Sequence, residues 1–147
     1  MDKKTLLELF FTSLSKMKRQ MELHSNSTVE ERVATMLQLQ TLSFLADNPN
    51  STPSQLATIL CLSSSSAAQL TDRLVNSGWI DRQHDKKDRR VVHLSLTSAG
   101  QEQLASLRTL RQKKMEPILK HVNKEDLEQL VHIMNNISIA LEKGAQK

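Results

Sequence analysis

The sequence predicts a mainly α-helical fold that carries one short two-stranded ribbon. Aromatic residues make up only 3% of the 147 residues, so the core must consist of aliphatic side chains, which suit helix packing better than a β-sandwich. In several long stretches, apolar residues recur at intervals of three and four, the period of an amphipathic helix. Strand-like runs are short and lie at residues 79–80 and 91–96.

The same composition excludes several functional classes. The chain has three glycines and one cysteine, too few for a glycine-rich phosphate loop, an intrachain disulfide framework or a Cys-only zinc site. Its five histidines lack the spacing of a zinc motif, and the Ser63–Ser66 run has no catalytic partner at local spacing. We therefore expect no enzyme activity, no metal and no cofactor.

Residues 1–24 and a second segment further along form the first two predicted helices. Apolar residues in 1–24 are spaced four, four, three and four apart, which places them on one helical face. A polar break follows at residues 25–28, and Thr35 is the expected N-cap of a second helix that ends at residues 48–50. The face of the first helix consists of Leu6, Phe10, Leu14, Met17 and Met21.

Two shorter helices come next. Thr52 is a good N-cap, and Pro53 suits the first position of a helix that stops near residues 61–62. Ser63 is the expected N-cap of the following helix, which Gly78 terminates.

A hairpin and two long helices complete the chain. The strand-like runs flank a polar tip at residues 85–88, which predicts a β-hairpin. Thr97 then caps a helix that is kinked or ended near Pro117, and residues 123–126 start a last helix.

The end helices carry more apolar face than a domain of this size covers alone. A second copy of the chain is the natural partner for such faces, and a self-contained α-bundle is the alternative. The N-terminal stretch lacks an uninterrupted signal-peptide core, and no window is apolar enough for a membrane span. We expect a homodimer in the cytoplasm, with no membrane partner.

Positive charge is concentrated in the hairpin. Residues 82–90 contain five basic and two acidic residues, so they hold three of the four units of net positive charge. A small protruding basic loop suits DNA phosphates and the narrow minor groove, although a charged turn is by itself also explained by solubility.

The helix pair at 52–60 and 63–77, joined by a turn at 61–62, has the lengths of a helix-turn-helix. In that motif, the N-terminal part of the second helix enters the major groove of DNA. A plain helical bundle gives the same pattern. The basic hairpin that directly follows the helix pair favours DNA binding. The expected contacts are Ser64, Ser65, Ser66 and Arg73 with phosphates, Ala68 with a thymine methyl, and Gln69 with adenine.

Three segments resemble the MarR family of transcriptional regulators. Residues 88–100 (DRRVVHLSLTSAG) resemble the family's wing, 74–80 (LVNSGWI) its link into the wing, and 52–57 (TPSQLA) its first motif helix. The resemblance covers about residues 34–100. It implies a winged helix-turn-helix DNA-binding domain at 34–97, with helical dimerisation regions at 1–33 and 98–147.

The resemblance also implies a mode of DNA binding. A homodimer would place two recognition helices in successive major grooves of a pseudo-palindromic operator, with each wing in a neighbouring minor groove. Arg90 corresponds to the family's wing arginine, Asp88 would brace it, and Asp72 would pair with it across to the recognition helix. Lys86, Lys87 and Arg89 complete the basic wing. Since the recognition helix carries little charge, we expect affinity to fall steeply with salt.

Regulation is the last inference from the resemblance. Proteins of this type respond to small aromatic or phenolic effectors or to thiol oxidation, and a repressor released by an effector is the expected mode. A pocket is expected near Met17, Met21, Leu39 and Trp79. Cys61 is expected to be a buried small hydrophobe, with a redox-sensing thiol as the alternative. A winged helix that binds protein is the other alternative, but such a wing would not need an Arg-Arg pair.

Overall fold

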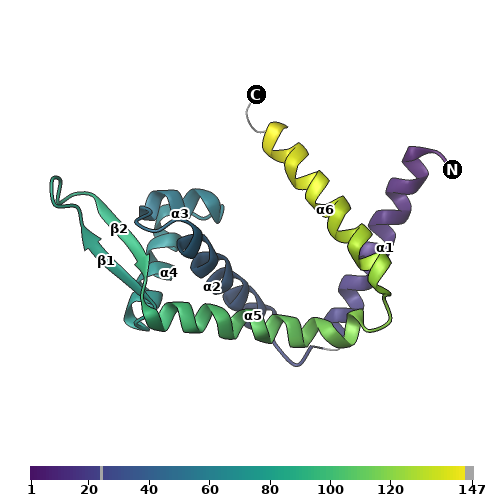
Figure 1. Cartoon of the computed structure of the whole chain (residues 1–147), viewed down its shortest axis with the longest axis horizontal. Helices are drawn as coiled ribbons and strands as arrows, with labels where there is room; N and C mark the ends of the chain where they lie inside the picture. The colour runs from purple at the N-terminus through teal and green to yellow at the C-terminus, as the bar shows by residue number, and fades with distance from the viewer. Residues whose placement is uncertain (24, 145–147) are drawn as a thin grey trace.

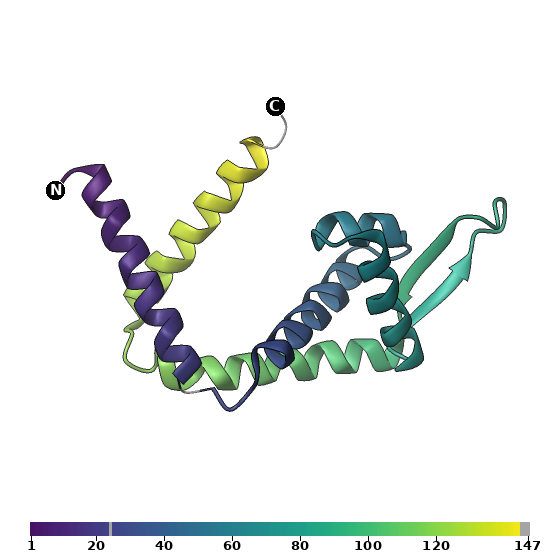
Figure 2. The same cartoon turned by 180° about the vertical axis from the view of Figure 1, so that it is seen from behind.

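The computed structural model describes residues 1–23 and 25–144 and is mainly helical, as predicted. Its elements are α1 (Lys3–Leu23), α2 (Val29–Asp47), α3 (Pro53–Ile59), α4 (Ser64–Asn76), β1 (Ile80–His84), β2 (Val92–Leu96), α5 (Ser98–Leu119) and α6 (Lys124–Gly144). Residue 24, where the first helix was expected to end, and residues 145–147 of the C-terminal region lie outside the described residues. Helix α5 forms a long base, with the hairpin at one end and α1 and α6 rising from the other (Figure 1; Figure 2).

The core lies at the hairpin end of α5. Helices α2, α3 and α4, the ribbon and the first half of α5 meet there, and burial of each leucine contributes about 1.5–3 kcal/mol. The core side chains are Leu42, Leu45, Leu56, Leu70, Leu74, Ile80, Leu94, Leu104 and Leu107. This packing gives α4 and the ribbon a fixed support.

Helices α1 and α6 differ from the rest because the described chain buries none of their residues. Their exposed apolar side chains include Leu6, Phe10, Leu14, Met17, Met21, Leu130, Met134, Ile137 and Leu141. Among residues 1–23 and 25–144, no helix is both long and apolar enough to cross a bilayer.

The start of α2 differs from the sequence prediction. The helix begins at Val29, not near Thr35, because Thr28 and Glu31 form a capping box. The Glu31 amide donates to the Thr28 hydroxyl at 3.2 Å, and the Thr28 amide donates to the Glu31 carboxylate at 2.9 Å. Thr35 lies inside the helix, where its hydroxyl donates to the Glu31 carbonyl. The spacing Thr-x-x-Glu was the signal for the earlier start.

The predicted caps of the next helices are confirmed, whereas the first strand runs to His84, beyond the predicted run at 79–80. Thr52, Ser63 and Thr97 are the N-caps of α3, α4 and α5. Gly78 follows the end of α4 with a φ of 74°, a left-handed conformation that favours glycine. Helix α5 ends two residues after Pro117.

Hydrogen bonds join the N-cap of α5 to the segment between α4 and β1. The Thr97 hydroxyl donates to the Gly78 carbonyl at 2.6 Å, and the Thr97 amide donates to the Trp79 carbonyl at 3.1 Å. Gly100 lies so close to this carbonyl that a Cβ at residue 100 would overlap it. The ribbon therefore projects from the base in a defined direction.

Candidate nucleic-acid interface

Helices α3 and α4 form the predicted helix-turn-helix and pack against each other. Four residues of α4 face the core: Ala67, Leu70, Thr71 and Leu74. The opposite face is solvent-exposed and holds every α4 residue predicted to contact DNA: Ser64, Ser65, Ser66, Ala68, Gln69 and Arg73. The spacing of three and four between buried residues thus turns the predicted contacts outward together.

The first turn of α4 is organised by Ser63. Its hydroxyl accepts the Ser66 amide at 3.1 Å, lies 3.0 Å from the Ser65 hydroxyl and donates to the Ser66 hydroxyl at 2.9 Å. Exposed hydroxyls at a helix N-terminus, where the helix dipole is positive, suit a phosphate oxygen.

The turn between the two helices contains Cys61, which is exposed rather than buried, so the expected burial is wrong. Cys61 has a φ of 52°, in the left-handed region that most residues avoid. The Leu62 amide donates to the Ala57 carbonyl at 2.9 Å and closes the turn. This backbone conformation directs the Cys61 side chain toward solvent while Leu62 packs against the core.

The ribbon is the wing that the sequence predicts. Its strands are antiparallel, and the register runs from Ile80 opposite Leu96 to His84 opposite Val92. Ile80 and Leu94 are buried, so even-numbered residues face the core. The exposed tip carries the predicted cations Lys86, Lys87, Arg89 and Arg90.

The basic tip is held by hydrogen bonds. One carboxylate oxygen of Asp85 accepts the amides of Lys87 and Asp88 at 2.7 and 3.0 Å. The Val91 amide donates to the Asp88 carbonyl at 2.9 Å, and the Asp85 amide donates to the Val91 carbonyl at 2.9 Å. The cations therefore project from a defined turn.

Asp88 contacts Arg90 as predicted. Its carboxylate accepts the Arg90 amide at 3.0 Å and the Arg90 Nε at 3.3 Å, while the Arg90 side chain stays 93% exposed. The guanidinium is thus directed by Asp88 yet open to solvent, as a groove contact requires.

The predicted Asp72–Arg90 pair is wrong. Asp72 of α4 pairs with Arg82 of β1, with 2.6 Å between Oδ1 and Nη2. Arg82 lies on the core-facing side of β1, which packs against α4, whereas Arg90 lies in the tip loop that joins β1 to β2. Figure 1 shows this loop at the far end of the ribbon from α4. The recognition helix is still tied to the wing, but through its first strand.

His93 joins the wing to the loop before α3, a role that sequence reasoning missed. Its Nδ1 lies 2.9 Å from the Asn50 carbonyl oxygen, and its Nε2 lies 3.2 Å from the Asp85 carboxylate. These acceptors raise the pKa of His93, the Asn50 carbonyl more than Asp85. The amides of Asp88 and Lys87, and then His93, lower the pKa of Asp85. No sequence motif marks this contact, because chain folding brings Asn50 to β2.

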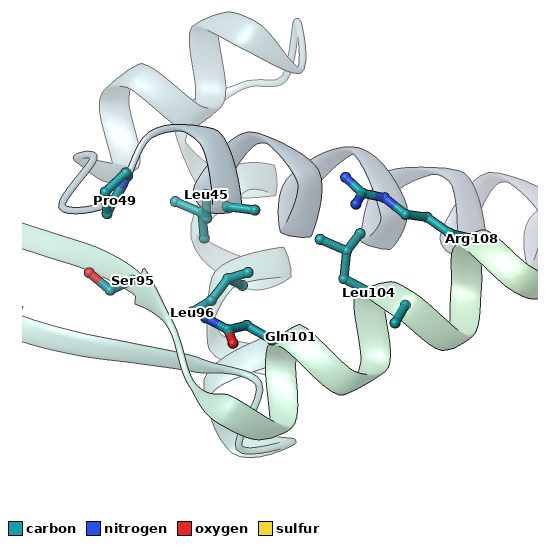
Figure 3. Close-up of a pocket in the computed structure, with 9 residues that line it drawn as sticks. Leu45, Pro49, Ser95, Leu96, Gln101, Leu104 and Arg108 are labelled. Atoms are coloured by element: carbon teal, nitrogen blue, oxygen red, sulfur yellow. The ribbon is translucent and has the colours of Figure 1, made fainter.

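A shallow hollow of about 470 Å³ lies between the end of α2, β2 and the start of α5. Figure 3 shows Leu45 and Leu104 facing each other across it, with Arg108 on α5 at one end and Pro49 and Ser95 at the other. The residues of the predicted effector pocket lie elsewhere: Met17 and Met21 are exposed on α1, and Leu39 and Trp79 pack against the core.

Potential metal ligands do not gather in the part of the chain that the structure describes. Among these residues, no group of three or more His, Cys, Asp or Glu side chains could hold an ion.

Comparison with known proteins decides the family. The profile of the MarR family matches residues 34–92. The HTH-type transcriptional repressor MdtR of Bacillus subtilis (strain 168) is 30% identical over 115 residues, which cover 78% of this chain and 74% of MdtR. The chain belongs to the MarR family. It is therefore a transcriptional regulator and not an enzyme, as the resemblance of residues 34–100 implied.

Two further similarities agree with this MarR-family assignment. The transcriptional repressor MprA of Escherichia coli (strain K12) is 33% identical over 90 residues, covering 54% of this chain and 51% of MprA. The crystal structure of the YusO protein from Bacillus subtilis superposes with a TM-score of 0.70 at 26% identity, covering 95% of this chain and 99% of YusO. The fold of this MarR-family protein is accordingly a winged helix-turn-helix with additional helices at both ends.

Proposed function

We propose that this MarR-family regulator represses transcription by binding a pseudo-palindromic operator as a homodimer, and that a small aromatic or phenolic effector releases it. One observation carries the DNA-binding part: the exposed face of α4 lies beside an ordered hairpin whose tip holds Lys86, Lys87, Arg89 and Arg90. A helix for the major groove and a basic loop for the minor groove are the two parts that recognition of this kind needs.

Within this proposal, different exposed residues contact the bases and the phosphates of the operator. Ala68 and Gln69 read base edges, because they lie on the exposed face within the first two turns of α4. The Ser64–Ser66 turn and Arg73 contact phosphates, which position the helix. The wing cations supply the remaining charge, because α4 itself carries one acid and one base.

The homodimer is supported by the apolar faces of α1 and α6. Phe10 is 57% exposed and Ile137 is 54% exposed in one chain, an arrangement that costs free energy unless another surface covers them. A two-fold dimer would cover both and present two α4 helices to two half-sites. We retain the division into a DNA-binding domain at 34–97 and dimerisation regions at 1–33 and 98–147, although residue 34 lies inside α2.

Repression and effector release rest on the family. MdtR and MprA are named repressors, and the same direction is proposed here. We keep Met17, Met21, Leu39 and Trp79 as the proposed effector residues, to be tested by thermal-shift screening with small phenolic acids. A regulator acts where the chromosome is, so a cytoplasmic location follows from the proposal.

The exposure of Cys61 favours a second candidate signal, thiol oxidation. An oxidised side chain at this position would alter the turn that sets α3 against α4. Loss of DNA binding with mild oxidant in the native chain, but not in Cys61→Ser, would support it. Equal sensitivity of both proteins would exclude it.

The primary test is a mobility shift with DNA from upstream of the protein's own coding region. We expect a shifted complex that weakens as salt increases, and weaker binding by Gln69→Ala. A winged helix that binds protein would give no salt-sensitive shift, which would contradict the proposal.

A further inference from the structure

We propose that His93 is a positioning residue that holds the basic wing tip against the loop leading into the helix-turn-helix only while its imidazole is protonated, so that operator affinity falls as His93 loses its proton. This inference rests on the proposed DNA binding and adds a residue to it that contacts the wing, not DNA.

The geometry makes His93 the bridge between two parts of the interface. Asn50 lies in the loop between α2 and α3, one residue before the Ser51 bridge to β2, and Asp85 begins the wing tip. The two ring nitrogens of His93 face these residues, Nδ1 toward the Asn50 carbonyl oxygen at 2.9 Å and Nε2 toward the Asp85 carboxylate at 3.2 Å. One imidazole thus spans from the loop before α3 to the tip.

Both partners of the imidazole are acceptors. A carbonyl oxygen and an ionised carboxylate have no proton to give, so both contacts are hydrogen bonds only when both ring nitrogens carry a proton. Neutral His93 has one N–H, and its other nitrogen then presents a lone pair to an acceptor. Loss of the proton must therefore weaken one of the two contacts.

The Asn50 acceptor is fixed from two sides. The Ser95 hydroxyl on β2 donates to the Asn50 side-chain oxygen at 3.1 Å. The backbone amide of Asn50 donates to the same hydroxyl oxygen at 3.3 Å. The Leu94 amide donates to the Ser51 carbonyl at 2.8 Å. When the bridge weakens, the tip is the part that is free to move.

Asp85 transmits the effect to the cations. Its Oδ2 faces His93 while its Oδ1 accepts the amides of Lys87 and Asp88, and Asp88 in turn holds Arg90. A change at the imidazole therefore reaches the residues proposed to contact the minor groove.

The two hydrogen-bond acceptors favour the protonated form of His93. The two acceptors raise the pKa of His93 above its ordinary value of about 6.5. A group with a raised pKa contributes its full stabilisation below the ordinary pKa and loses it as pH rises through the higher value. The elements that contact β2 carry further charged or titratable groups, while α3 has none. They are Glu30, Glu31, Arg32 and Asp47 on α2, Asp81, Arg82 and His84 on β1, Asp85, Lys86, Lys87, Asp88, Arg89 and Arg90 at the tip, and Glu102, Arg108, Arg111, Lys113, Lys114 and Glu116 on α5.

The test is an operator titration of the full chain from pH 6 to 8.5 at constant ionic strength. His93→Gln keeps hydrogen-bonding capacity but cannot be protonated. His84→Gln is the matched control, because His84 lies in the same ribbon and its Nδ1 lies 2.8 Å from the Arg89 carbonyl oxygen, within the wing itself. Between pH 6 and pH 8.5, we expect the operator affinity of the native chain and of His84→Gln to fall about two-fold to ten-fold more than the affinity of His93→Gln. NMR titration should also show a lower imidazole pKa at His93 in Asp85→Asn.

The outcomes separate the two proposals. If DNA binding is intact and His93→Gln shows the same pH dependence as the native chain, the role of His93 is wrong and the proposed function stands. If no protein binds DNA at any pH, the proposed function is wrong, and this inference falls with it.

Discussion

Asp72 of the recognition helix α4 and Arg82 of wing strand β1 form an ion pair with 2.6 Å between the carboxylate oxygen and the guanidinium nitrogen. The two side chains are 57% and 36% exposed, so solvent screens the pair and its contribution to folding stability is about 0.2–1 kcal/mol. Its importance lies in orientation, because it joins the two elements that are proposed to enter adjacent grooves.

Asp72→Ala should loosen the wing without unfolding the protein. We expect operator affinity to fall about two-fold to five-fold, which corresponds to a loss of about 0.4–1 kcal/mol of binding free energy because the wing is less well oriented. Urea unfolding should change by less than about 1 kcal/mol. Fluorescence anisotropy with labelled operator DNA measures the first quantity and circular dichroism the second.

Double-mutant cycles distinguish Arg82 from Arg90 as the partner of Asp72. The cycle with Arg82→Ala should show coupling, and the cycle with Arg90→Ala should be additive, because Arg90 is held by Asp88 instead. Coupling between Asp72 and Arg90 alone would contradict the structure.

Gly100→Ala should destabilise the fold by about 1–3 kcal/mol, because the added Cβ would overlap the Trp79 carbonyl at the junction of α5 with the wing. Gly144→Ala is the control, since nothing lies within 4 Å of a Cβ there. Thermal unfolding of both variants checks this. Equal melting temperatures for Gly100→Ala and Gly144→Ala would contradict the close contact between Gly100 and the Trp79 carbonyl.

Cys61→Gly should stabilise the protein by up to about 1 kcal/mol. A left-handed residue with a side chain costs about 1–2 kcal/mol, which exceeds the extra chain entropy that glycine loses on folding. Cys61→Ala should give no such gain, because alanine keeps the strain. Ala68→Gly, in the regular part of α4, should instead cost about 1 kcal/mol. Denaturant titration measures the free energy of unfolding of the three variants. A lower value for Cys61→Gly than for the native chain would contradict the backbone strain inferred at Cys61.

Ile137→Glu on α6 should disrupt the proposed dimer by placing a charge in its apolar face. Ile59→Glu is matched in chemistry and exposure, 58% against 54%, but lies on α3 and should leave the oligomeric state unchanged. Sedimentation of the 16.7 kDa chain measures this, with twice that mass expected for the native protein. A native monomer at micromolar concentration would contradict the dimer.

Local signals in the sequence predicted local structure well. The N-caps Thr52, Ser63 and Thr97 each accept the backbone amide three positions along the chain, so the sequence predicts them directly. The start of α2 has an equally local signal, the capping box of Thr28 with Glu31, but Thr28 also ends a run of polar residues that is typical of a break between helices.

Relationships between distant residues were predicted less well. Which arginine faces Asp72 depends on the pleat of the hairpin, which turns Arg82 toward α4. The exposure of Cys61 depends on a backbone angle that composition does not report. The His93 bridge depends on the packing of the loop before α3 against β2.

Most of the net charge of the chain lies in the wing, and the claim that it binds DNA there is the centre of this account. The salt dependence of operator affinity tests it most directly, by comparing the native chain with Lys86→Gln/Lys87→Gln and with the control Lys113→Gln/Lys114→Gln, which removes the same charge from exposed residues of α5. We predict a steep decline of log K with log salt for the native chain and the control, and a slope smaller by about one for each lost phosphate contact in the wing variant. A flat dependence for the native chain, or identical slopes for all three, would contradict the account.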